Sequence, residues 1–208
     1  TVLFSDMSGF TALSETLDPE EVREIMAQVF SRAAEIVAYY DGRIEKFIGD
    51  AVMATFGVPT AHEDDPVRAV RAAVELHAAM AALSPDIERR TRVRLALHSG
   101  VNTGLVVTGE LQFGAGTAGP MGDTINLAAR LMSAAPSGEI WVGPQTRGLV
   151  AQAFELDDLG PQDFKGKAGA VAVARVRAAV SRGATPRQFR GSFVGRQAEL
   201  DVLLGAAD

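Results

Sequence analysis

Apolar residues in the first half of the chain follow two patterns, one typical of strands and one typical of a helix. A strand-like run, TVLFS, opens the sequence, and apolar residues at helical spacing across residues 22–40 predict a helix. The runs RIEKFI (residues 43–48) and AVMATF (residues 51–56) are rich in Ile, Val and Phe, as strands are. Gly49-Asp50 between them is a tight-turn signal, so the two runs are predicted to form a β-hairpin.

The second half interleaves further helices and strands. Acidic residues and an early proline predict a helix that starts at residues 64–66 and continues to Leu83. The alternating segment at residues 91–100 predicts a strand, with residues 104–111 as its hairpin partner. The other predicted elements are a Gly-rich loop over residues 113–123, a helix over 124–135, a strand over 139–143, a short helix over 144–154, and closing strands over 154–160 and 171–178. This order predicts an α+β fold with a mixed sheet.

The composition changes after about residue 180. Residues 1–180 form one predicted domain that is long enough for a substantial core. Residues 181–192, rich in Gly, Pro, Arg and Ser, are a predicted linker, and residues 193–208 begin an amphipathic unit too short to fold alone. Because the chain also opens abruptly on a strand-like run, we expect it to be a piece of a longer protein.

Charge and composition narrow the classes of partner. A formal net charge of −6 provides no basic surface for nucleic acid. An acidic protein that handles an anionic ligand needs local cations or metal ions to offset its own charge. The chain has no cysteine, and no apolar run approaches the roughly 18 residues of a membrane span. These features fit a cytoplasmic protein without a membrane partner.

Two aspartates stand at comparable places in the predicted strands. Asp6 follows the first strand and precedes backbone N–H groups that open a helix and favour phosphate, and Asp50 occupies the hairpin turn. Carboxylates so placed can hold two hard divalent cations, with substrate phosphates supplying further oxygens. Taken one at a time, each aspartate also has a purely structural explanation: Asp6 as a helix N-cap and Asp50 as a turn residue.

Three segments together carry a family resemblance. FSDMSGFTALSE, EKFIGDAVMATFG and MGDTINLAARL occur in this order and closely resemble signature segments of the class III nucleotide cyclases, the catalytic domains of adenylyl and guanylyl cyclases. The resemblance covers nearly all of residues 1–177. It implies a ferredoxin-like α+β fold, with a mixed, mostly antiparallel sheet flanked by helices. It also implies a homodimer that converts ATP to 3′,5′-cyclic AMP and pyrophosphate.

The resemblance assigns the two aspartates to metal binding. In the family, two aspartates bind two metal ions, and they match Asp6 and Asp50 here; the backbone carbonyl of Met7 would add a ligand. The expected cofactors are therefore two divalent cations, Mg²⁺ or Mn²⁺. One ion would lower the pKa of the ribose 3′-hydroxyl that attacks the α-phosphorus, and the other would hold the triphosphate.

Asn126 and Arg130 lie four residues apart in TINLAAR, so a helix places them on one face. They match the asparagine that orients the ribose in the family and the arginine that stabilises charge on the transferring phosphate. A planar guanidinium suits that task better than an ammonium group. Without the motif, Asn126 and Arg130 would be interpreted as part of an ordinary helix surface with a solvated Arg.

Base recognition follows the family pattern only in part. Lys46 matches a lysine that reads the purine edge, and as a donor it can bond N1 of adenine, whereas guanine presents N1–H there. Lys46 therefore favours ATP. The usual partner of that lysine is an Asp or Thr, but this chain has Gly119 there, which has no side chain to accept from the adenine amino group. Thr117 is a substitute if the loop shifts.

The resemblance also implies contacts to the rest of the nucleotide. Arg94 matches an arginine near the triphosphate, and Lys165 matches a lysine that reaches the terminal phosphates, in preference to Lys167. Phe10 and Thr11, just after the first aspartate segment, are further expected substrate contacts. Exposed lysines are more commonly ordinary turn charges, so that reading stays open for both lysines.

Several other features carry less weight. GAGTAG (residues 114–119) fits a dinucleotide-binding pattern, but it lacks the strand–loop–helix setting, so we interpret it as a flexible loop. The three histidines show no metal-ligand spacing. The tail from Ser192 onward resembles the start of an ATP-binding regulatory domain that follows the cyclase in some bacterial proteins. The competing functions are a non-catalytic nucleotide-binding regulatory module and a guanylyl cyclase.

Overall fold

The computed structural model describes residues 1–107, 111–113, 116–118, 122–167 and 169–180. In chain order its elements are β1 (Val2–Ser8), α1 (Phe10–Thr16), α2 (Pro19–Tyr39), β2 (Gly42–Ile48), β3 (Ala51–Phe56), α3 (Asp65–Thr91), β4 (Ala96–Asn102), β5 (Leu111–Phe113), β6 (Gly116–Ala118), α4 (Asp123–Ala134), β7 (Ile140–Val142), α5 (Pro144–Val150), β8 (Phe154–Gln162) and β9 (Val171–Ala179). The predicted linker and the predicted start of a further domain lie outside the described residues.

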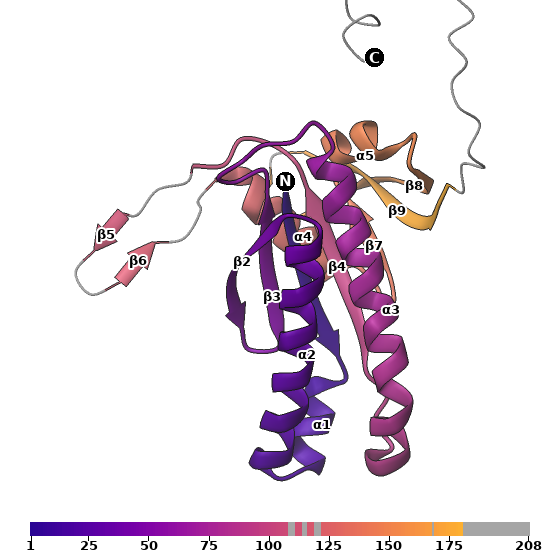
Figure 1. The fold of residues 1–208 in the computed structure, drawn as a ribbon. Helices are drawn as coiled ribbons and strands as arrows, with labels where there is room; N and C mark the ends of the chain where they lie inside the picture. The colour runs from indigo at the N-terminus through magenta and orange to yellow at the C-terminus, as the bar shows by residue number, and fades with distance from the viewer. Residues whose placement is uncertain (108–110, 114–115, 119–121, 168, 181–208) are drawn as a thin grey trace, which may run out of the picture.

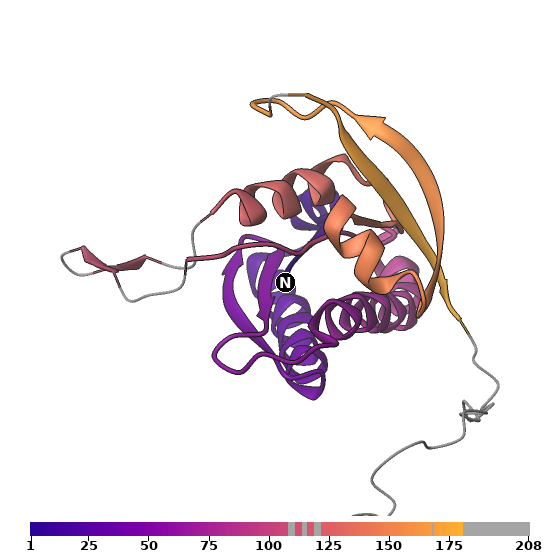
Figure 2. The same cartoon turned by 90° about the horizontal axis from the view of Figure 1, so that it is seen from above.

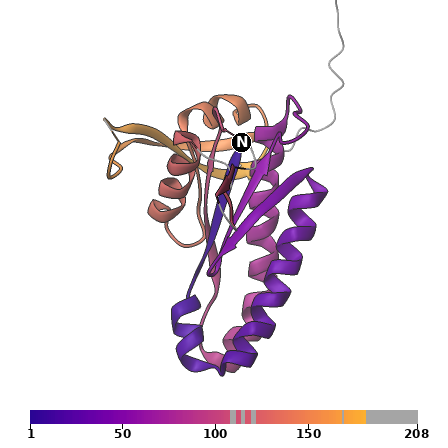
Figure 3. The same ribbon diagram turned by 90° about the vertical axis from the view of Figure 1, so that its left-hand side faces the viewer.

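A seven-stranded sheet in the order β2-β3-β1-β4-β7-β9-β8 forms the centre of the molecule. Neighbouring strands run antiparallel, except that β4 and β7 are parallel. The two long helices α2 and α3 lie side by side on one face, and α4 lies on the other (Figures 1 and 3). The α+β fold with a mixed, mostly antiparallel sheet is therefore confirmed.

Alternation along β1 separates two hydrophobic cores. Leu3 and Met7 belong to the larger core beneath α2 and α3, whereas Phe4 packs with Ala128 of α4 in a smaller core. Because side chains two residues apart in a strand share a face, Asp6 lies on the face of Phe4, the same face that α4 covers. The pattern of the strand thus decides which helix the carboxylate meets.

The prediction for the segment after the first strand is wrong in part. β1 extends to Ser8, so Asp6 lies inside the strand, and the expected polar turn contains the short helix α1. Gly9 joins the two elements with φ of 94°, and a Cβ there would lie 2.6 Å from the carbonyl oxygen of Arg94. Only glycine fits so sharp a turn at so close an approach.

The helix predicted to end at Leu83 instead continues through Pro85 to Thr91. Ile87 is buried and prolongs the apolar stripe of α3 past the proline. Burial of that stripe therefore outweighs the local cost of a proline in the helix. As a result β4 starts at Ala96, five residues later than predicted.

The predicted hairpin between β4 and residues 104–111 is also wrong. Both edges of β4 are occupied, by β1 on one side and β7 on the other, so no edge is free for that segment. Residues 111–113 instead pair with residues 116–118 in a separate two-stranded sheet. The described part of the predicted Gly-rich loop therefore contains a strand.

Figure 2 shows the molecule from above, with α4 on the side of the sheet opposite to α2, and α5 beside α3, with which it shares the larger core. The β8–β9 pair curves around this end of the sheet, and its residues Leu159 and Val173 join a third small core with Leu127 and Leu131 of α4. Within the described part of the chain, no helix is both long and apolar enough to cross a membrane.

Candidate active site

Asp6 lies directly opposite His98 in the antiparallel pairing of β1 with β4. The residue at the N-cap of α1 is Gly9, and no side chain donates or accepts a capping hydrogen bond there. The structure therefore excludes a simple N-cap role for Asp6. The carboxylate instead lies on the sheet, on the face covered by α4, where a ligand can meet it.

Asp50 follows Gly49, whose φ of 62° makes the tight turn between β2 and β3. Burial raises the pKa of Asp50, and the negative charge of Asp6 raises it further. The hairpin predicted around Gly49 and Asp50 is thus present, and its turn brings the second carboxylate close enough to Asp6 for the two charges to interact. A turn role for Asp50 and an N-cap role for Asp6 do not explain why the two carboxylates lie close together.

The two carboxylates differ in their response to protons. The His98 ring holds the pKa of Asp6 below its ordinary value, with help from the backbone N–H of Met7. The ionised form of Asp50, in contrast, is destabilised, because burial and the charge of Asp6 both disfavour it. A divalent cation bound by both carboxylates relieves this repulsion, and an all-oxygen donor set suits Mg²⁺ or Mn²⁺.

The donor set is incomplete on the protein side. Among the described residues, no group of three or more His, Cys, Asp or Glu side chains could hold a metal ion. Asp6 and Asp50 together with the backbone carbonyl of Met7 would therefore need oxygens from a ligand. Mg²⁺ sites that use substrate phosphates have this composition.

His98 is a functional candidate that the sequence interpretation missed. Its Nδ1 lies 2.7 Å from the carbonyl oxygen of Met132 on α4, and its Nε2 lies 3.4 Å from Oδ2 of Asp6. Metal-ligand spacing in the sequence could not reveal it, because the signal is the strand register that pairs residue 98 with residue 6. That register needs the pairing of β1 with β4, two strands that have residues 9–95 between them in the sequence.

Lys46 lies on β2, the edge strand of the sheet, just after a β-bulge. It pairs with Met53, a member of the smaller core, so its side chain is on the same face as Asp6. The side chain of Lys46 is exposed. Gly119, its expected counterpart in base recognition, lies outside the described residues.

Asn126 and Arg130 lie in α4 on the surface that faces away from the cores, because Leu127 and Leu131 take the buried positions. The Arg130 guanidinium lies beside the β8–β9 connection, where a Cβ added to Gly166 would be 3.2 Å from its Nη2. In the described part of the chain, no hydrogen bond or ion pair joins either residue to the two aspartates.

The expected phosphate contacts are spread over three places. Lys165 is exposed in the β8–β9 connection, whereas Lys167, the less favoured candidate, pairs with Asp123 at the first position of α4 at 2.5 Å. Arg94 is exposed just before β4. The expected contacts in α1 differ from each other, since Phe10 packs on the larger core and Thr11 is exposed.

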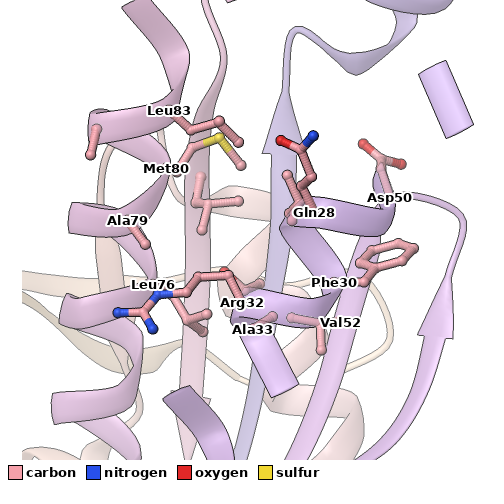
Figure 4. Close-up of a pocket in the computed structure, with 14 residues that line it drawn as sticks. Gln28, Phe30, Arg32, Ala33, Asp50, Val52, Leu76, Ala79, Met80 and Leu83 are labelled. Carbon is pink, nitrogen blue, oxygen red and sulfur yellow. The ribbon is translucent and has the colours of Figure 1, made fainter. Parts of the chain in front are cut away.

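A cavity of about 420 Å³ lies between α2 and α3 on the other face of the sheet. Figure 4 shows Gln28 and Asp50 at one end of it and Leu76, Met80 and Leu83 along one wall. Its walls are mostly hydrocarbon, which suits neither a triphosphate nor a ribose. We therefore place the site where Asp6 meets the turn that carries Asp50, at the rim of this cavity and not within it.

Comparisons with known proteins agree with this geometry. A family model described as the adenylate and guanylate cyclase catalytic domain matches residues 1–175. The crystal structure of the adenylyl cyclase CyaB from P. aeruginosa has a TM-score of 0.80 at 32% identity, covering 85% of this chain and 92% of that chain. The guanylyl cyclase Cya2 has a TM-score of 0.79 at 29% identity, covering 88% and 93%.

A curated sequence relative is adenylate cyclase 1 of Rhizobium meliloti, 33% identical over 137 residues, or 63% of this chain. The match covers 20% of that relative, and a match to a Mycobacterium bovis protein covers 37% of its length. The chain thus corresponds to a minor part of these longer proteins. With a model matched over residues 1–175 and the fold shared with both kinds of cyclase, the chain belongs to the adenylate and guanylate cyclase catalytic-domain family.

Proposed function

We propose that this domain is an adenylyl cyclase that converts ATP to 3′,5′-cyclic AMP and pyrophosphate. The observation that carries the proposal is the approach of Asp6 on β1 to Asp50 in the β2–β3 turn, which leaves two carboxylates in mutual repulsion. Such a pair is unfavourable unless a cation or a proton joins it. In a cation-dependent reaction on a polyphosphate, the two carboxylates would bind the cation.

The residues of the chain have distinct tasks in this reaction. Asp6 and Asp50, with the carbonyl of Met7, hold divalent cations, which when bound acidify the ribose 3′-hydroxyl and offset the charge of the triphosphate. Asn126 orients the ribose so that its 3′-oxygen lies in line with the α-phosphorus. The Arg130 guanidinium stabilises charge on the phosphate as the new P–O bond forms and pyrophosphate leaves.

We further infer that each site is shared between two copies of the chain. The support is that Asn126 is exposed on α4 and that, among the described residues, no hydrogen bond or ion pair joins it or Arg130 to the aspartate pair. A two-fold axis that brings α4 of one copy to the aspartates of the other completes two equivalent sites from one sequence. Lys46 on the edge strand would then read the base.

Lys46 also supports ATP over GTP. An ammonium group donates only, so it bonds the unprotonated N1 of adenine and not the N1–H of guanine. Because similar structures include both an adenylyl and a guanylyl cyclase, this choice needs a direct test.

The test is product formation from ATP and from GTP, each with excess Mg²⁺ or Mn²⁺, at several protein concentrations. We expect cyclic AMP, with a specific activity that rises with protein concentration as dimers form. An Asp50→Asn preparation purified in parallel controls for a contaminating cyclase. Cyclic GMP as the main product would refute the role of Lys46, and retained nucleotide binding without any product would indicate a binding module.

A further inference from the structure

We propose that the cavity between α2 and α3 binds a small, uncharged molecule with a hydrocarbon body and one hydroxyl group. The inference goes beyond the proposed function, because binding there needs neither nucleotide nor cation. Asp50 is the lining residue that the cavity shares with the candidate active site. Only the expected effect of an occupant on activity rests on the proposed function.

The cavity has the size and the surface of a small-molecule site. Its volume is about 420 Å³, within the range of roughly 300–1,000 Å³ that ligand pockets have. Leu76, Met80 and Leu83 of α3 form one wall (Figure 4), and Val52 and Leu97 line it from the sheet. In such pockets a few polar groups fix the orientation of a largely apolar ligand. The occupant therefore has a hydrocarbon body, and its polar group must match the polar lining residues.

The charges around the cavity disfavour an anion. Asp50 lies at one end, where its carboxylate repels a negative group. Arg32 is the one cation among the described lining residues, but its Nη1 lies 2.9 Å from Glu35 and its Nη2 lies 3.6 Å from Glu75. The guanidinium is thus already paired. No unpaired cation remains among these lining residues for a carboxylate or phosphate ligand.

A buried hydrogen-bond chain sets the polarity of the inner wall. Burial lowers the pKa of His77 to about 4, so its ring is neutral at pH 7. The ring hydrogen-bonds the backbone of Gly138, whose own N–H donates to Leu97. The ring therefore donates to the Gly138 carbonyl through Nδ1, which leaves Nε2 as an acceptor. Because Nε2 lies 2.8 Å from Oγ of Ser99, the Ser99 hydroxyl donates to it.

Ser5 ends this chain at the cavity. Its Oγ lies 2.6 Å from Oγ of Ser99, and because the Ser99 hydrogen is directed to His77, Ser5 is the donor of this pair. The hydroxyl hydrogen of Ser5 is thereby used, so toward the cavity its oxygen only accepts. The ionised Asp50 carboxylate also only accepts, and the Gln28 amide accepts through its oxygen. A ligand hydroxyl, which donates, matches all three groups.

Asp50 connects the cavity to the aspartate pair. It lines the cavity, and it also lies close enough to Asp6 for the two charges to interact. A hydroxyl that donates to the Asp50 carboxylate uses oxygen lone pairs that a cation would otherwise bind. Within the proposed function, we therefore expect an occupant of the cavity to lower cyclase activity.

The test uses three probes with the same bicyclic ring: 2-naphthol, naphthalene and 2-naphthoate. Equilibrium dialysis against the wild-type protein at pH 7, without nucleotide or metal, measures their binding. We expect saturable binding of one 2-naphthol per chain, about 3- to 10-fold tighter than that of naphthalene, as one net hydrogen bond implies. 2-Naphthoate should bind more weakly than either, because its charge meets Asp50.

Ala79→Phe tests whether the probe occupies this cavity. Ala79 lies on the α3 wall, so a phenyl ring there fills space that the ligand needs. The matched control is Ala78→Phe, because Ala78 precedes it in the helix but is exposed and lies outside the lining of the cavity. We expect 2-naphthol binding to weaken about 10-fold or more in Ala79→Phe and to stay at the wild-type value in Ala78→Phe.

Equal binding of 2-naphthol and naphthalene would refute the preference for a hydroxyl, and equal binding of 2-naphthoate would refute the preference for an uncharged ligand. Wild-type affinity in Ala79→Phe would refute the cavity as the site. Should Ala79→Phe fail to fold, the methyl resonance of Met80 in the wild-type protein decides. It must shift as 2-naphthol binds, and an unchanged resonance overturns the proposal.

Cyclic AMP formation separates this proposal from the proposed function. Inhibition by 2-naphthol should saturate over the same concentrations as its binding. Binding without inhibition would refute the connection through Asp50 and leave the binding site standing. A wild-type protein that forms no cyclic AMP would refute the proposed function, while the dialysis results would still decide the binding site.

Discussion

Asp50 is unfavourable for the fold, and the proposed function makes the same residue necessary for the chemistry. Its pKa is raised by burial and by Asp6, so its ionised form opposes folding at neutral pH, and this opposition fades as pH falls through the raised pKa. Asp50→Asn removes that charge. We expect cyclase activity to fall by about 100-fold or more, since one carboxylate of the cation site is lost.

The same substitution should leave the melting temperature unchanged or higher. Thermal unfolding followed by circular dichroism, alongside cyclic AMP formation, checks both parts. Substantial turnover by the purified Asp50→Asn protein would contradict the assignment of Asp50 to cation binding, and a large drop in melting temperature would show that the residue serves the turn instead.

His77 should make the stability of the domain depend on pH. Burial lowers the pKa of His77 from 6.5 to about 4, and its Nε2 lies 2.8 Å from Oγ of Ser99 beneath the sheet. Between these two pKa values the unfolded chain binds a proton that the folded chain does not, so stability falls as pH is lowered from about 6.5 toward 4. Between pH 7 and pH 5 the loss from His77 should be about 2 kcal/mol.

Urea unfolding of the wild type and of His77→Gln at pH 7 and pH 5 measures this contribution. The difference between the two proteins isolates His77 from His98, whose pKa is raised by Asp6 and whose effect on stability has the opposite sign. Equal pH dependence in the wild type and the variant would show that His77 takes up its proton as readily in the folded as in the unfolded state.

At the scale of single elements, the local sequence pattern predicts an element correctly where distant packing contacts favour the same conformation. The hairpin of β2 and β3 and the start of α3 follow from turn and helix-start signals, and so could be predicted. The continuation of α3 through Pro85 could not, because it depends on the burial of Ile87 against distant residues. His98 was missed for the same reason, since only the pairing of β1 with β4 makes it a neighbour of Asp6.

The contact between β4 and α4 leads to a prediction about glycine. A Cβ at Gly100 would lie 2.2 Å from the carbonyl oxygen of Ala128 and 2.3 Å from the backbone nitrogen of Met132, so the helix rests directly on the strand. Gly100→Ala should destabilise the domain by about 1–3 kcal/mol or more, because backbone cannot give way as a flexible side chain can. It should also lower activity, because α4 carries Arg130.

A matched substitution in another helix separates crowding from the general effect of replacing glycine. A Cβ at Gly148 in α5 meets nothing within 4 Å, so Gly148→Ala should stabilise the domain by about 0.5–1 kcal/mol. Chemical denaturation of both variants gives the two values. Similar stability of Gly100→Ala and the wild type would mean that α4 can lift from the sheet without cost.

For the whole molecule, the shared-site arrangement predicts complementation between two inactive variants. Asp50→Asn lacks the cation side and Arg130→Ala lacks the phosphate side. In a mixed dimer one site loses both residues and the other keeps both. Equal mixing should therefore restore about one quarter of wild-type activity, since half of the dimers are mixed and each has one complete site of two.

The measurement is cyclic AMP formation by each variant alone and by the refolded mixture, with mixed dimers identified through two different affinity tags. Purified mixed dimers without activity would contradict the sharing of sites. Activity in either variant alone at a level near that of the mixture would show instead that the substituted residue is dispensable.

The position of β2 has an evolutionary consequence. Lys46 lies on a strand paired along one edge only, next to a β-bulge, whereas Asp6 and His98 lie on two central strands of the sheet. A mutation that shifts the edge strand or replaces its side chains disturbs few neighbours, while a change on β1 or β4 disturbs both cores. With the roles proposed for Lys46 and the aspartates, lineages could exchange one purine for another at the rim of the sheet while the centre keeps the phosphate chemistry, in keeping with the occurrence of adenylyl and guanylyl cyclases on one fold.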